Sequence, residues 1–307
     1  MLIFNDEPLD VLIKTKEHCI HKDYVKYLLG EDLKVPKEIK NKEHKISIII
    51  PNCNYSEWLH KCLGSILNQT YKNYEVIFID DCSTDNSVEI AESYKDKMDI
   101  KVIELKQKRL NGGARNEGYL HVSKDTDYIW YVDSDDWLRD SDVLKRINDN
   151  LKCEPDVLFV GLSTDNDNII TSYYIPNYKD KYAAMQGWSG SSGKVIKKEL
   201  ATRQECLYKE GTLKEDRTQH YKVCIHMESF KCLKEVVYVW NRSNTKSVTT
   251  IRNNLWKVST FRNYADALEV YEEEKGKDLK VDQILMQRVN ECENELITKG
   301  DSQRWDM

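Results

Sequence analysis

The chain has few of the features that mark a membrane or secreted protein. No apolar run in its 307 residues approaches the length of a bilayer span, and the start, MLIFNDEPLD, lacks the basic-then-apolar order of a secretory signal. The nine cysteines are odd in number and form no CxxC pair, which excludes a regular disulfide framework. We therefore expect a soluble, cytoplasmic protein with reduced thiols and no transmembrane segment.

Positive charge is not in excess either. The chain has 46 Lys and Arg residues against 52 Asp and Glu residues, so its net charge is -6. Without a basic surplus there is no overall field to gather nucleic acid through counter-ion release, and such a function is weakly disfavoured. Hydrophobic residues make up 40% of the chain, which is enough for a substantial core and argues against disorder of the whole chain.

Strand-like and helix-like segments alternate through the middle of the sequence. Apolar runs typical of strands buried on both faces of a parallel sheet lie at KISIIIP, YEVIFIDD, IKVIEL and YIWYV. Helical patterns follow the first three, with Ser56 as the expected N-cap of the first helix and a glycine turn before the third. This alternation predicts an α/β fold with a doubly wound, mostly parallel sheet flanked by helices.

The two ends of the chain differ from this middle part. Residues 1–44 are rich in Lys and Glu and combine helical spacing with a polar linker, which predicts a helical N-terminal extension. Residues 45–250 form the main domain, although the regular order weakens between 163 and 192. Residues 251–307 are charged and have a helical pattern, so we expect a helical C-terminal region.

Polar residues gather where three predicted strands end. The three segments are Pro51-Asn52-Cys53, Asp80-Asp81 and Asp133-Ser134-Asp135-Asp136. In a doubly wound sheet, ligands bind beyond the carboxyl ends of the strands. Carboxylates this close cannot all stay ionised in a cleft without a cation, and oxygen ligands favour Mg²⁺ or Mn²⁺. Such a cation completes its shell with water and substrate phosphate, which indicates a diphosphate ligand.

Groups that suit an anion are predicted near the same edge. Gly112 and Gly113 at a helix start would let backbone N–H groups approach an anion, and Arg115 in the first turn adds a positive charge. Each feature alone has a simpler interpretation, since an Asp-x-Asp is more often a turn or a helix cap and a glycine pair is mostly a turn. Their joint occurrence at the ends of successive strands favours a site.

These motifs together resemble the inverting glycosyltransferases of family 2, which have the GT-A fold and use nucleotide-diphosphate sugars. The matching segments lie within residues 45–247 and are SIIIPNCNYSEWLHKCLGSILNQTYKNYEVIFIDDCSTDNS, NGGARNEG, YIWYVDSDDWL, KVIKKEL, LKEDRTQHY and YVWNRSNTKSVT. The resemblance implies a hexosyltransferase that uses a UDP-sugar donor and Mn²⁺ or Mg²⁺, and that inverts the anomeric carbon in a single displacement.

The resemblance also implies roles for individual residues. The nucleotide-sugar site would comprise Pro51, Asn52, Cys53, Asp81, Gly112, Gly113, Arg115, Asp133, Ser134 and Asp135. Asp81 would accept a ring N–H of the nucleobase, Asp135 and Asp133 would hold the metal, and Asp216 would be the catalytic base. Chemistry supports such a base, because a sugar hydroxyl is a poor nucleophile until a carboxylate accepts its proton. Without the family context, Glu215 and Asp216 could equally be first-turn charges of a helix.

Four residues depart from the family pattern or have more than one interpretation. Cys53 stands where an aromatic residue often packs on the base, and Cys82 stands where glycine is usual, so that its turn must differ or carry mild strain. We expect His220 on a helix surface rather than at the metal. Trp188 is either a platform for the acceptor or a core residue.

Two other functions compete with glycosyl transfer. A nucleotidyltransferase would usually have a phosphate loop rich in glycine and lysine after the first strand, and PNCNYSEW contains neither. A catalytically inactive sugar-nucleotide or partner-binding module is disfavoured because Asp133, Asp135 and Asp216 are retained together. The acceptor stays open, since a glycan, another polymer, a lipid-linked sugar, a protein or a modified nucleobase would each present a hydroxyl. The sequence does not specify an oligomeric state.

Overall fold

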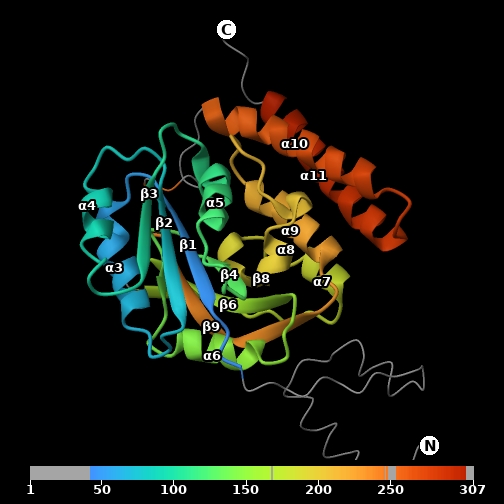
Figure 1. Ribbon diagram of the computed structural model, residues 1–307. Coiled ribbons are helices and arrows are strands. Elements are labelled where there is room, and N and C mark those ends of the chain that lie inside the picture. The colour runs from blue at the N-terminus through green and yellow to red at the C-terminus, as the bar shows by residue number, and fades with distance from the viewer. Residues whose placement is uncertain (1–41, 167–168, 246, 248–253, 302–307) are drawn as a thin grey trace, which may run out of the picture.

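The computed structural model describes residues 42–166, 169–245, 247 and 254–301, which are built around one curved sheet of nine strands (Figure 1). The strands are β1 (Ile46–Asn52), β2 (Tyr74–Asp80), β3 (Ile100–Glu104), β4 (Tyr128–Tyr131), β5 (Trp137–Leu138), β6 (Val157–Asn166), β7 (Ile169–Tyr174), β8 (Lys194–Lys197) and β9 (Phe230–Asn241). The helices are α3 (Ser56–Leu67), α4 (Ser87–Glu92), α5 (Leu110–Leu120), α6 (Val143–Leu151), α7 (Lys181–Met185), α8 (Lys198–Ala201), α9 (Glu215–His226), α10 (Asn254–Glu274) and α11 (Leu279–Asp301).

The sheet confirms the predicted fold class, and three of its strands, β5, β7 and β8, run opposite to the others. The strand order is β3-β2-β1-β4-β8-β6-β9-β5, and β7 pairs with β6. Strands β1 to β4 are mutually parallel, whereas β8 runs antiparallel between β4 and β6. Because β8 is antiparallel to both β4 and β6, β6 has the same direction as β1 to β4, and β9 is parallel to β6. Six of the nine strands therefore point the same way. Their carboxyl ends lie on the side where such sheets bind ligands.

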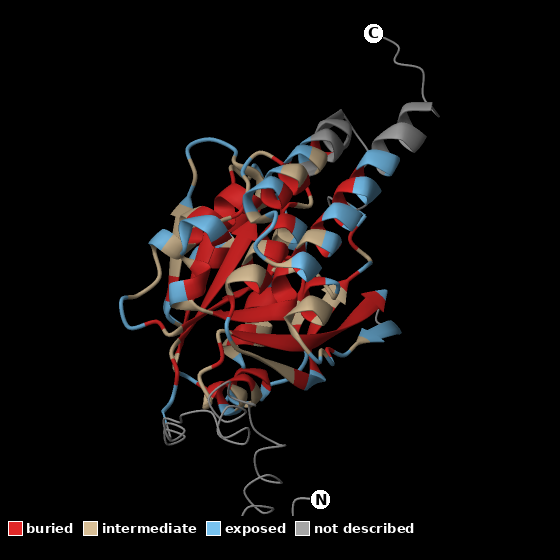
Figure 2. Cartoon of the chain, turned by 90° about the vertical axis from the view of Figure 1, so that its right-hand side faces the viewer, coloured by how far each residue is buried: buried red, intermediate tan, exposed pale blue. Residues whose placement is uncertain are grey.

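Both faces of the sheet are covered, and β1 shows why its sequence is continuously apolar. Successive side chains of a strand point to opposite faces. Ile48 and Ile50 pack into the apolar layer beneath α3 and α6, while Ile49 belongs to the layer beneath α5 and α9. Figure 2 shows the central strands as buried, whereas β7 is exposed and β3 and part of β9 are less completely covered.

The start of α3 corrects one prediction. The helix begins at Ser56, but the N-cap position is Tyr55, and no side chain at that position caps the helix. Instead, the backbone N–H of Ser56 donates to Oδ2 of Asp85 at 3.0 Å. A carboxylate from the loop after β2 therefore satisfies the helix start and ties the first two strand ends together.

The C-terminal helices α10 and α11 form a hairpin on the α9 side of the sheet (Figure 1). Val270 and Leu285, one from each helix, are buried in the same apolar layer as α5 and α9. The helical character expected for this region is thus present over 254–301. The predicted N-terminal extension lies outside the described residues, except for 42–44. No described helix is long and apolar enough to cross a membrane.

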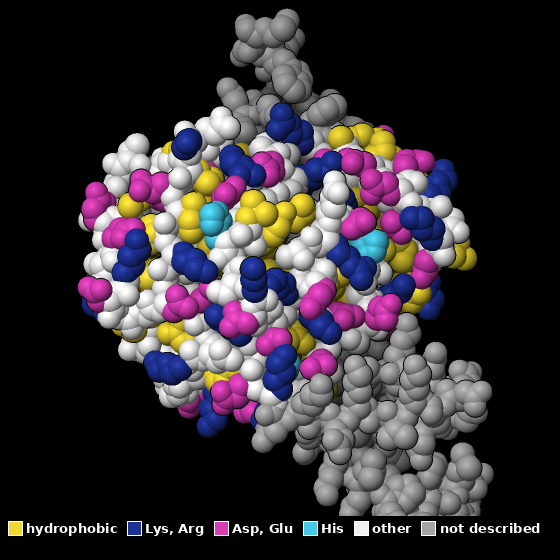
Figure 3. Space-filling model, viewed as in Figure 1, with side chains coloured by type: hydrophobic (Ala, Val, Ile, Leu, Met, Phe, Trp, Pro, Cys, Tyr) yellow, Lys and Arg dark blue, Asp and Glu magenta, His cyan; other side chains and the backbone are white. Residues whose placement is uncertain are grey.

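The surface carries charges of both signs. On the face seen in Figure 3, Lys and Arg side chains are interspersed with Asp and Glu side chains, and neither sign gathers into a large patch. This pattern matches the near balance of 46 positive and 52 negative residues in the whole chain. That face therefore has no basic field for a polyanion.

Candidate active site

A cavity of about 350 Å³ opens at the carboxyl ends of the parallel strands. It is lined by residues at the end of β1 and just after it, in α5, in the 133–136 turn, in the 187–192 loop, at the start of α9 and at the end of β9. Six predicted site residues meet there, namely Pro51, Arg115, Asp133, Ser134, Asp135 and Asp216. Segments far apart in the chain thus converge as the positions of the strand ends predicted.

Arg115 is the central cation of this cavity. It is only 4% exposed, and its guanidinium lies 2.7 Å from Oδ1 of Asp133 and 2.6 Å from Oε1 of Glu215. Burial by itself would lower the pKa of Arg115, but the charges of Asp133 and Glu215 outweigh burial and raise the pKa above its ordinary value. The guanidinium also lies 5.2 Å from the ring of Tyr208. Arg115 therefore links the 133–136 turn to the start of α9 as a permanent positive charge.

The 133–136 turn crowds carboxylates into a partly desolvated space. Asp135 is 7% exposed and accepts a hydrogen bond from Nδ2 of Asn244 at 2.7 Å. Burial, followed by the charge of Asp133, raises the pKa of Asp135 to about 6. The side chain of Asp133 is 36% exposed, so it remains open toward ligand space. A divalent cation near these oxygens would relieve their repulsion.

The donor set fits Mg²⁺ or Mn²⁺ rather than a closed metal site. The described residues contain no group of three or more His, Cys, Asp or Glu side chains arranged to hold a metal on their own. Two carboxylates, with water and diphosphate oxygens completing the shell, are what these hard cations typically use. Asp135 and Asp133 therefore suit a cation that arrives with its substrate.

Asp136 has a structural role instead. It is 2% exposed, and it accepts hydrogen bonds from the hydroxyl of Tyr238 and from the backbone N–H of Asn241, the latter at 2.8 Å. Burial, with the charges of Asp135 and Asp133, raises the pKa of Asp136 well above its usual range. The side chain anchors the turn to the end of β9, so we do not assign it to the metal.

The first two residues of α9, Glu215 and Asp216, are both acidic but differ in burial. Glu215 is buried against Arg115, and burial raises its pKa to about 7 although Arg115 opposes the shift. Asp216 is only partly buried and lines the cavity. Because Glu215 is committed to the ion pair, Asp216 is the better placed of the two to accept a proton from a ligand.

Five predicted nucleotide-binding residues lie outside the cavity lining, namely Asn52, Cys53, Asp81, Gly112 and Gly113. Asp81 is 3% exposed and accepts the backbone N–H groups of Arg109 and Leu110 at 2.6 and 2.8 Å, which caps α5. Asn52 donates to Oδ1 of Asp80 at 3.0 Å, and Sγ of Cys53 accepts from Lys108 at 3.1 Å. The structure thus shows Asn52, Cys53 and Asp81 shaping the loops beside the cavity, and their contact with a base stays a prediction.

The glycine pair corrects another expectation. Gly112 and Gly113 lie within α5 rather than in a turn before it, and both are buried. A Cβ on Gly112 would come within 2.5 Å of the carbonyl oxygen of Lys209, and one on Gly113 within 2.4 Å of Cβ of Arg109. The pair allows the close packing of α5; it lies outside the cavity lining, and the anion contact predicted for it stays a prediction.

Four non-glycine residues with left-handed backbone flank the site, and the first is Asn54, with φ of 60°, between the lining residues Pro51 and Tyr55. Cys82 follows Asp81 with φ of 60°, Leu110 begins α5 with φ of 60°, and Lys214 precedes α9 with φ of 65°. A non-glycine residue in this region costs about 1–2 kcal/mol. The mild strain considered for Cys82 is therefore present, and similar strain occurs at the starts of the helices that carry Arg115 and Asp216.

The remaining histidine and tryptophan predictions have different outcomes. His220 is wholly buried rather than on the helix surface, and its Nε2 lies 2.9 Å from the carbonyl oxygen of Ala184. Burial lowers the pKa of His220 to about 3, so the ring is neutral. Trp188 packs against the core and also lines the cavity, so its role as an acceptor platform stays a prediction.

Lys194 is a site-forming residue that the sequence analysis missed. Its side chain is fully buried, and its ammonium donates to the carbonyl oxygens of Ser189 and Gly190 at 2.8 and 2.9 Å. It thereby fixes the loop that forms one side of the cavity. The available signal was a lysine directly between a Gly- and Ser-rich loop and an apolar strand, in GWSGSSGKVI.

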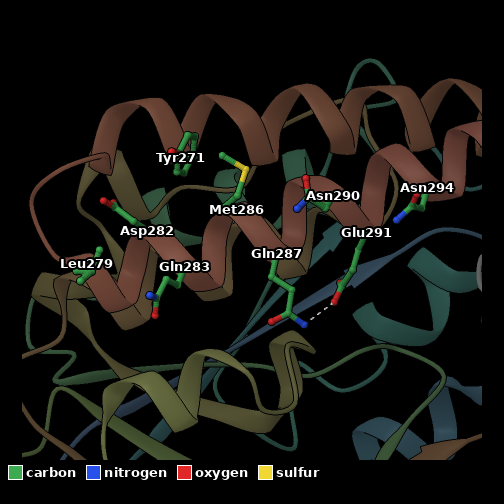
Figure 4. A pocket seen from close by; sticks show the side chains of 9 residues that line it. All are labelled: Tyr271, Leu279, Asp282, Gln283, Met286, Gln287, Asn290, Glu291 and Asn294. Carbon is green, nitrogen blue, oxygen red and sulfur yellow. Dashed lines mark hydrogen bonds between the residues drawn. The ribbon is translucent and has the colours of Figure 1, made fainter.

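A larger hollow of about 650 Å³ lies along α11, away from this chemistry (Figure 4). Its described lining consists of Tyr271 from α10 and residues of α11, mainly amides with Leu279 and Met286. There Nε2 of Gln287 donates a hydrogen bond to Oε1 of Glu291 at 3.1 Å. None of the predicted site residues lines this hollow, so its size does not make it the active site.

Comparison with known proteins now identifies the family. Residues 47–207, more than half of the chain, match the protein-family model described as Glycosyl transferase family 2. The chain belongs to glycosyl transferase family 2. The resemblance to family 2 inferred from the motifs is thereby confirmed.

The curated relatives that match this chain are named as bacterial glycosyltransferases. Glycosyltransferase GlyA of Streptococcus pneumoniae is 27% identical over 237 residues, which cover 70% of this chain and 33% of GlyA. The poly(ribitol-phosphate) beta-glucosyltransferase of Bacillus spizizenii is 36% identical over 116 residues, 37% of this chain and 18% of that protein. Glycosyltransferase GlyG of S. pneumoniae is 41% identical over 98 residues, 31% of this chain and 32% of GlyG. The aligned parts therefore span a third or less of these curated relatives.

Solved structures confirm the GT-A fold of this family 2 chain. Residues 1–349 of TarS from Staphylococcus aureus, in complex with UDP-GlcNAc, superpose with a TM-score of 0.67 at 20% identity, over 80% of this chain and 72% of that one. The mannosyltransferase PcManGT from Pyrobaculum calidifontis, in complex with GDP-Man and Mn²⁺, gives a TM-score of 0.54 at 16% identity, over 92% and 82%. At such identities the likeness is one of fold.

Proposed function

We propose that this family 2 chain is a metal-dependent, inverting hexosyltransferase that moves a sugar from a UDP-sugar to an acceptor hydroxyl by single displacement. The observation that carries the proposal is the convergence of Asp133, Asp135 and Asp216 on one cavity at the strand ends. The solved complexes of TarS with UDP-GlcNAc and of PcManGT with GDP-Man and Mn²⁺ support a nucleotide-sugar donor and a divalent cation. The described cysteines are all free thiols, which supports a reducing, cytoplasmic setting.

The donor side of the cavity is suited to a departing diphosphate. When bound by Asp135 and Asp133, Mn²⁺ or Mg²⁺ would supply positive charge to neutralise the leaving group. Arg115 holds Asp133 in place at 2.7 Å and keeps a further positive charge at the cavity. Asp81 orders the start of α5, so that Arg115 is presented from a capped helix. On the proposed assignment, Asp81 and the 51–53 segment also border the nucleobase.

Asp216 supplies the general base. As the acceptor oxygen attacks the anomeric carbon, its proton passes to the Asp216 carboxylate, and the bond between that carbon and the diphosphate oxygen breaks with its electron pair on the diphosphate. Attack from the face opposite the leaving group inverts the configuration. The neighbouring Glu215 cannot replace Asp216 because it is buried in the ion pair with Arg115.

Two variants test this proposal. We predict that Asp216→Asn binds the donor as the wild type does but loses transfer by a factor of about 10² to 10⁴, the usual size of a general-base contribution. Asp135→Ala is expected to lose the donor binding that depends on Mn²⁺. Donor affinity is measured by calorimetry, and turnover by release of the nucleotide diphosphate from a panel of donors with and without Mn²⁺. Transfer by Asp216→Asn at the wild-type rate would reject the base assignment.

A further inference from the structure

One side of the cavity is aromatic rather than acidic. Trp188 and Trp240 both line it, and their rings meet at 64° with centroids 5.4 Å apart. Both side chains are only partly buried, so part of each indole is left for a ligand. Asp216, the proposed base, lines the same cavity, and its negative charge raises the pKa of Lys194. Because Lys194 donates to two carbonyl oxygens of the 187–192 loop, Asp216 lies on the same side of the cavity as that loop.

This aromatic wall is held in place by the protein itself. The backbone N–H of Trp188 donates to the hydroxyl of Tyr174 at 3.0 Å, and the guanidinium of Arg242 lies 4.5 Å from the ring of Trp240. Gly190 and Gly193 lie against Trp188 so closely that a Cβ on either would come within 2.4 or 2.7 Å of the indole. A surface that is ordered before binding loses little entropy when a ligand arrives.

The charge of the lining selects against an anionic acceptor. Among the described lining residues, the carboxylates of the 133–136 turn and of Asp216 outnumber the two guanidinium groups, Arg115 and Arg217. Arg115 is already paired with Asp133 and Glu215. Even with a cation on the turn, the donor diphosphate and the Asp216 carboxylate would lie beside a phosphate group on the acceptor and repel it, whereas an uncharged ligand would not be repelled.

We infer that Trp188 and Trp240 form the acceptor subsite, and that the acceptor hydroxyl is carried by an uncharged pyranose ring. A pyranose presents a flat face of C–H groups that packs against an aromatic ring, while its hydroxyl groups point outward to polar partners such as the serines of the 187–192 loop. An acyclic polyol phosphate has neither the flat apolar face nor the neutral charge. The inference rests on the proposed function, because Asp216 must receive the proton of that hydroxyl.

An acceptor panel tests the inference with the full chain. Release of nucleotide diphosphate is measured with Mn²⁺ and a set of UDP- and GDP-sugars, with water alone, methyl pyranosides or ribitol 5-phosphate as acceptor. We expect a methyl pyranoside to accelerate release at least about tenfold over hydrolysis, and ribitol 5-phosphate to have no such effect. Hydrolysis of a donor without a response to any pyranoside, or a stronger response to ribitol 5-phosphate, overturns the acceptor assignment alone. No release from any donor under any condition contradicts the proposed function itself.

Tryptophan variants test the subsite. Trp240→Leu should raise the acceptor KM about tenfold against an unchanged donor KM, and Trp240→Phe, which keeps a smaller aromatic face, about threefold. Trp58→Leu, a partly buried tryptophan of α3 outside the cavity lining, should change neither constant. If Trp240→Leu does not fold, the Phe variant carries the test. An acceptor KM that stays at the wild-type value in the folded Trp240 variants overturns the inference.

Discussion

At the scale of single residues, Lys194 shows how a charge is used to shape the cavity. Its side chain is fully buried, and no carboxylate lies within ion-pair distance of it among the described residues; two carbonyl oxygens of the 187–192 loop accept its hydrogen bonds. Burial lowers the pKa of Lys194 to about 8, although the charge of Asp216 opposes this shift. A buried ammonium is costly, and here it orders the loop that carries Trp188.

We predict that Lys194 makes stability depend on pH above pH 8. Between pH 8 and 10.5, the unfolded lysine keeps a proton that the folded one has lost, so the free energy of unfolding rises with pH. The slope from this one group is at most about 1.4 kcal/mol per pH unit. Below pH 8, Lys194 is protonated in both states and contributes no slope.

Urea unfolding of the wild type and of Lys194→Met across this pH range measures the effect. As the pH rises from 8 to 10.5, the free energy of unfolding of the wild type should increase relative to that of the variant. Two curves that stay parallel over the whole range would show that Lys194 does not titrate as described.

At the scale of elements, α5 connects several parts of the site. The carboxylate of Asp81 caps its start, and Gly112 in its first turn packs against the backbone of Lys209. Arg115, which also belongs to α5, forms ion pairs with both Asp133 and Glu215. One helix thus relates the loop after β2, the 133–136 turn and the start of α9. A shift of α5 would therefore move the main cation of the cavity.

A pair of glycine substitutions separates packing from helix propensity. Gly112→Ala should destabilise the protein by about 1–3 kcal/mol, because the new Cβ would press on a backbone carbonyl only 2.5 Å away. Gly64→Ala in α3 is the matched control, since the nearest atom to its Cβ is Oη of Tyr94 at 4.0 Å. That change should stabilise the protein by about 0.5–1 kcal/mol. Chemical denaturation measures both, and equal effects of the two substitutions would refute the packing role of Gly112.

At the scale of the whole molecule, the cavity joins two separate stretches of the chain. Residues 51–136 contribute the carboxylates and Arg115, while residues 187–247 contribute the aromatic wall and Asp216. A ligand that contacts both stretches binds only the folded state, and it should therefore stabilise the entire structure.

Removal of the metal should abolish most of that stabilisation. We predict that UDP with Mn²⁺ raises the midpoint of thermal unfolding by several degrees, since a ligand at one hundred times its Kd adds about 2.7 kcal/mol. EDTA should reverse the shift, because the diphosphate then meets the unneutralised carboxylates of Asp133 and Asp135. Asp135→Ala should show little shift in either condition. A shift of equal size with UDP and EDTA would argue against metal-dependent binding.

The parts of the structure that depend on local pattern were predictable. The continuous apolar strands and the polar residues at their ends led to the sheet and to four residues of the cavity, Pro51, Asp133, Ser134 and Asp135, because strand direction alone brings carboxyl ends to one edge. Arg115 was predicted from the start of a helix, and Asp216 came from the resemblance to the family. The errors concern groups whose surroundings are distant in sequence. Ser56 depends on Asp85 of another loop, and His220 is buried by residues of α7.

The sequence by itself determined the order of strands and helices and the kinds of chemical group at the strand ends, because periodicity and residue type are local properties. Only the tertiary structure decided the surroundings of each carboxylate. Asp136 accepts hydrogen bonds from the end of β9 and Glu215 is paired with Arg115, whereas the less committed Asp135 and Asp216 line the cavity. Burial and hydrogen-bond partners make this difference, and both come from segments about a hundred residues apart that meet only in the folded chain.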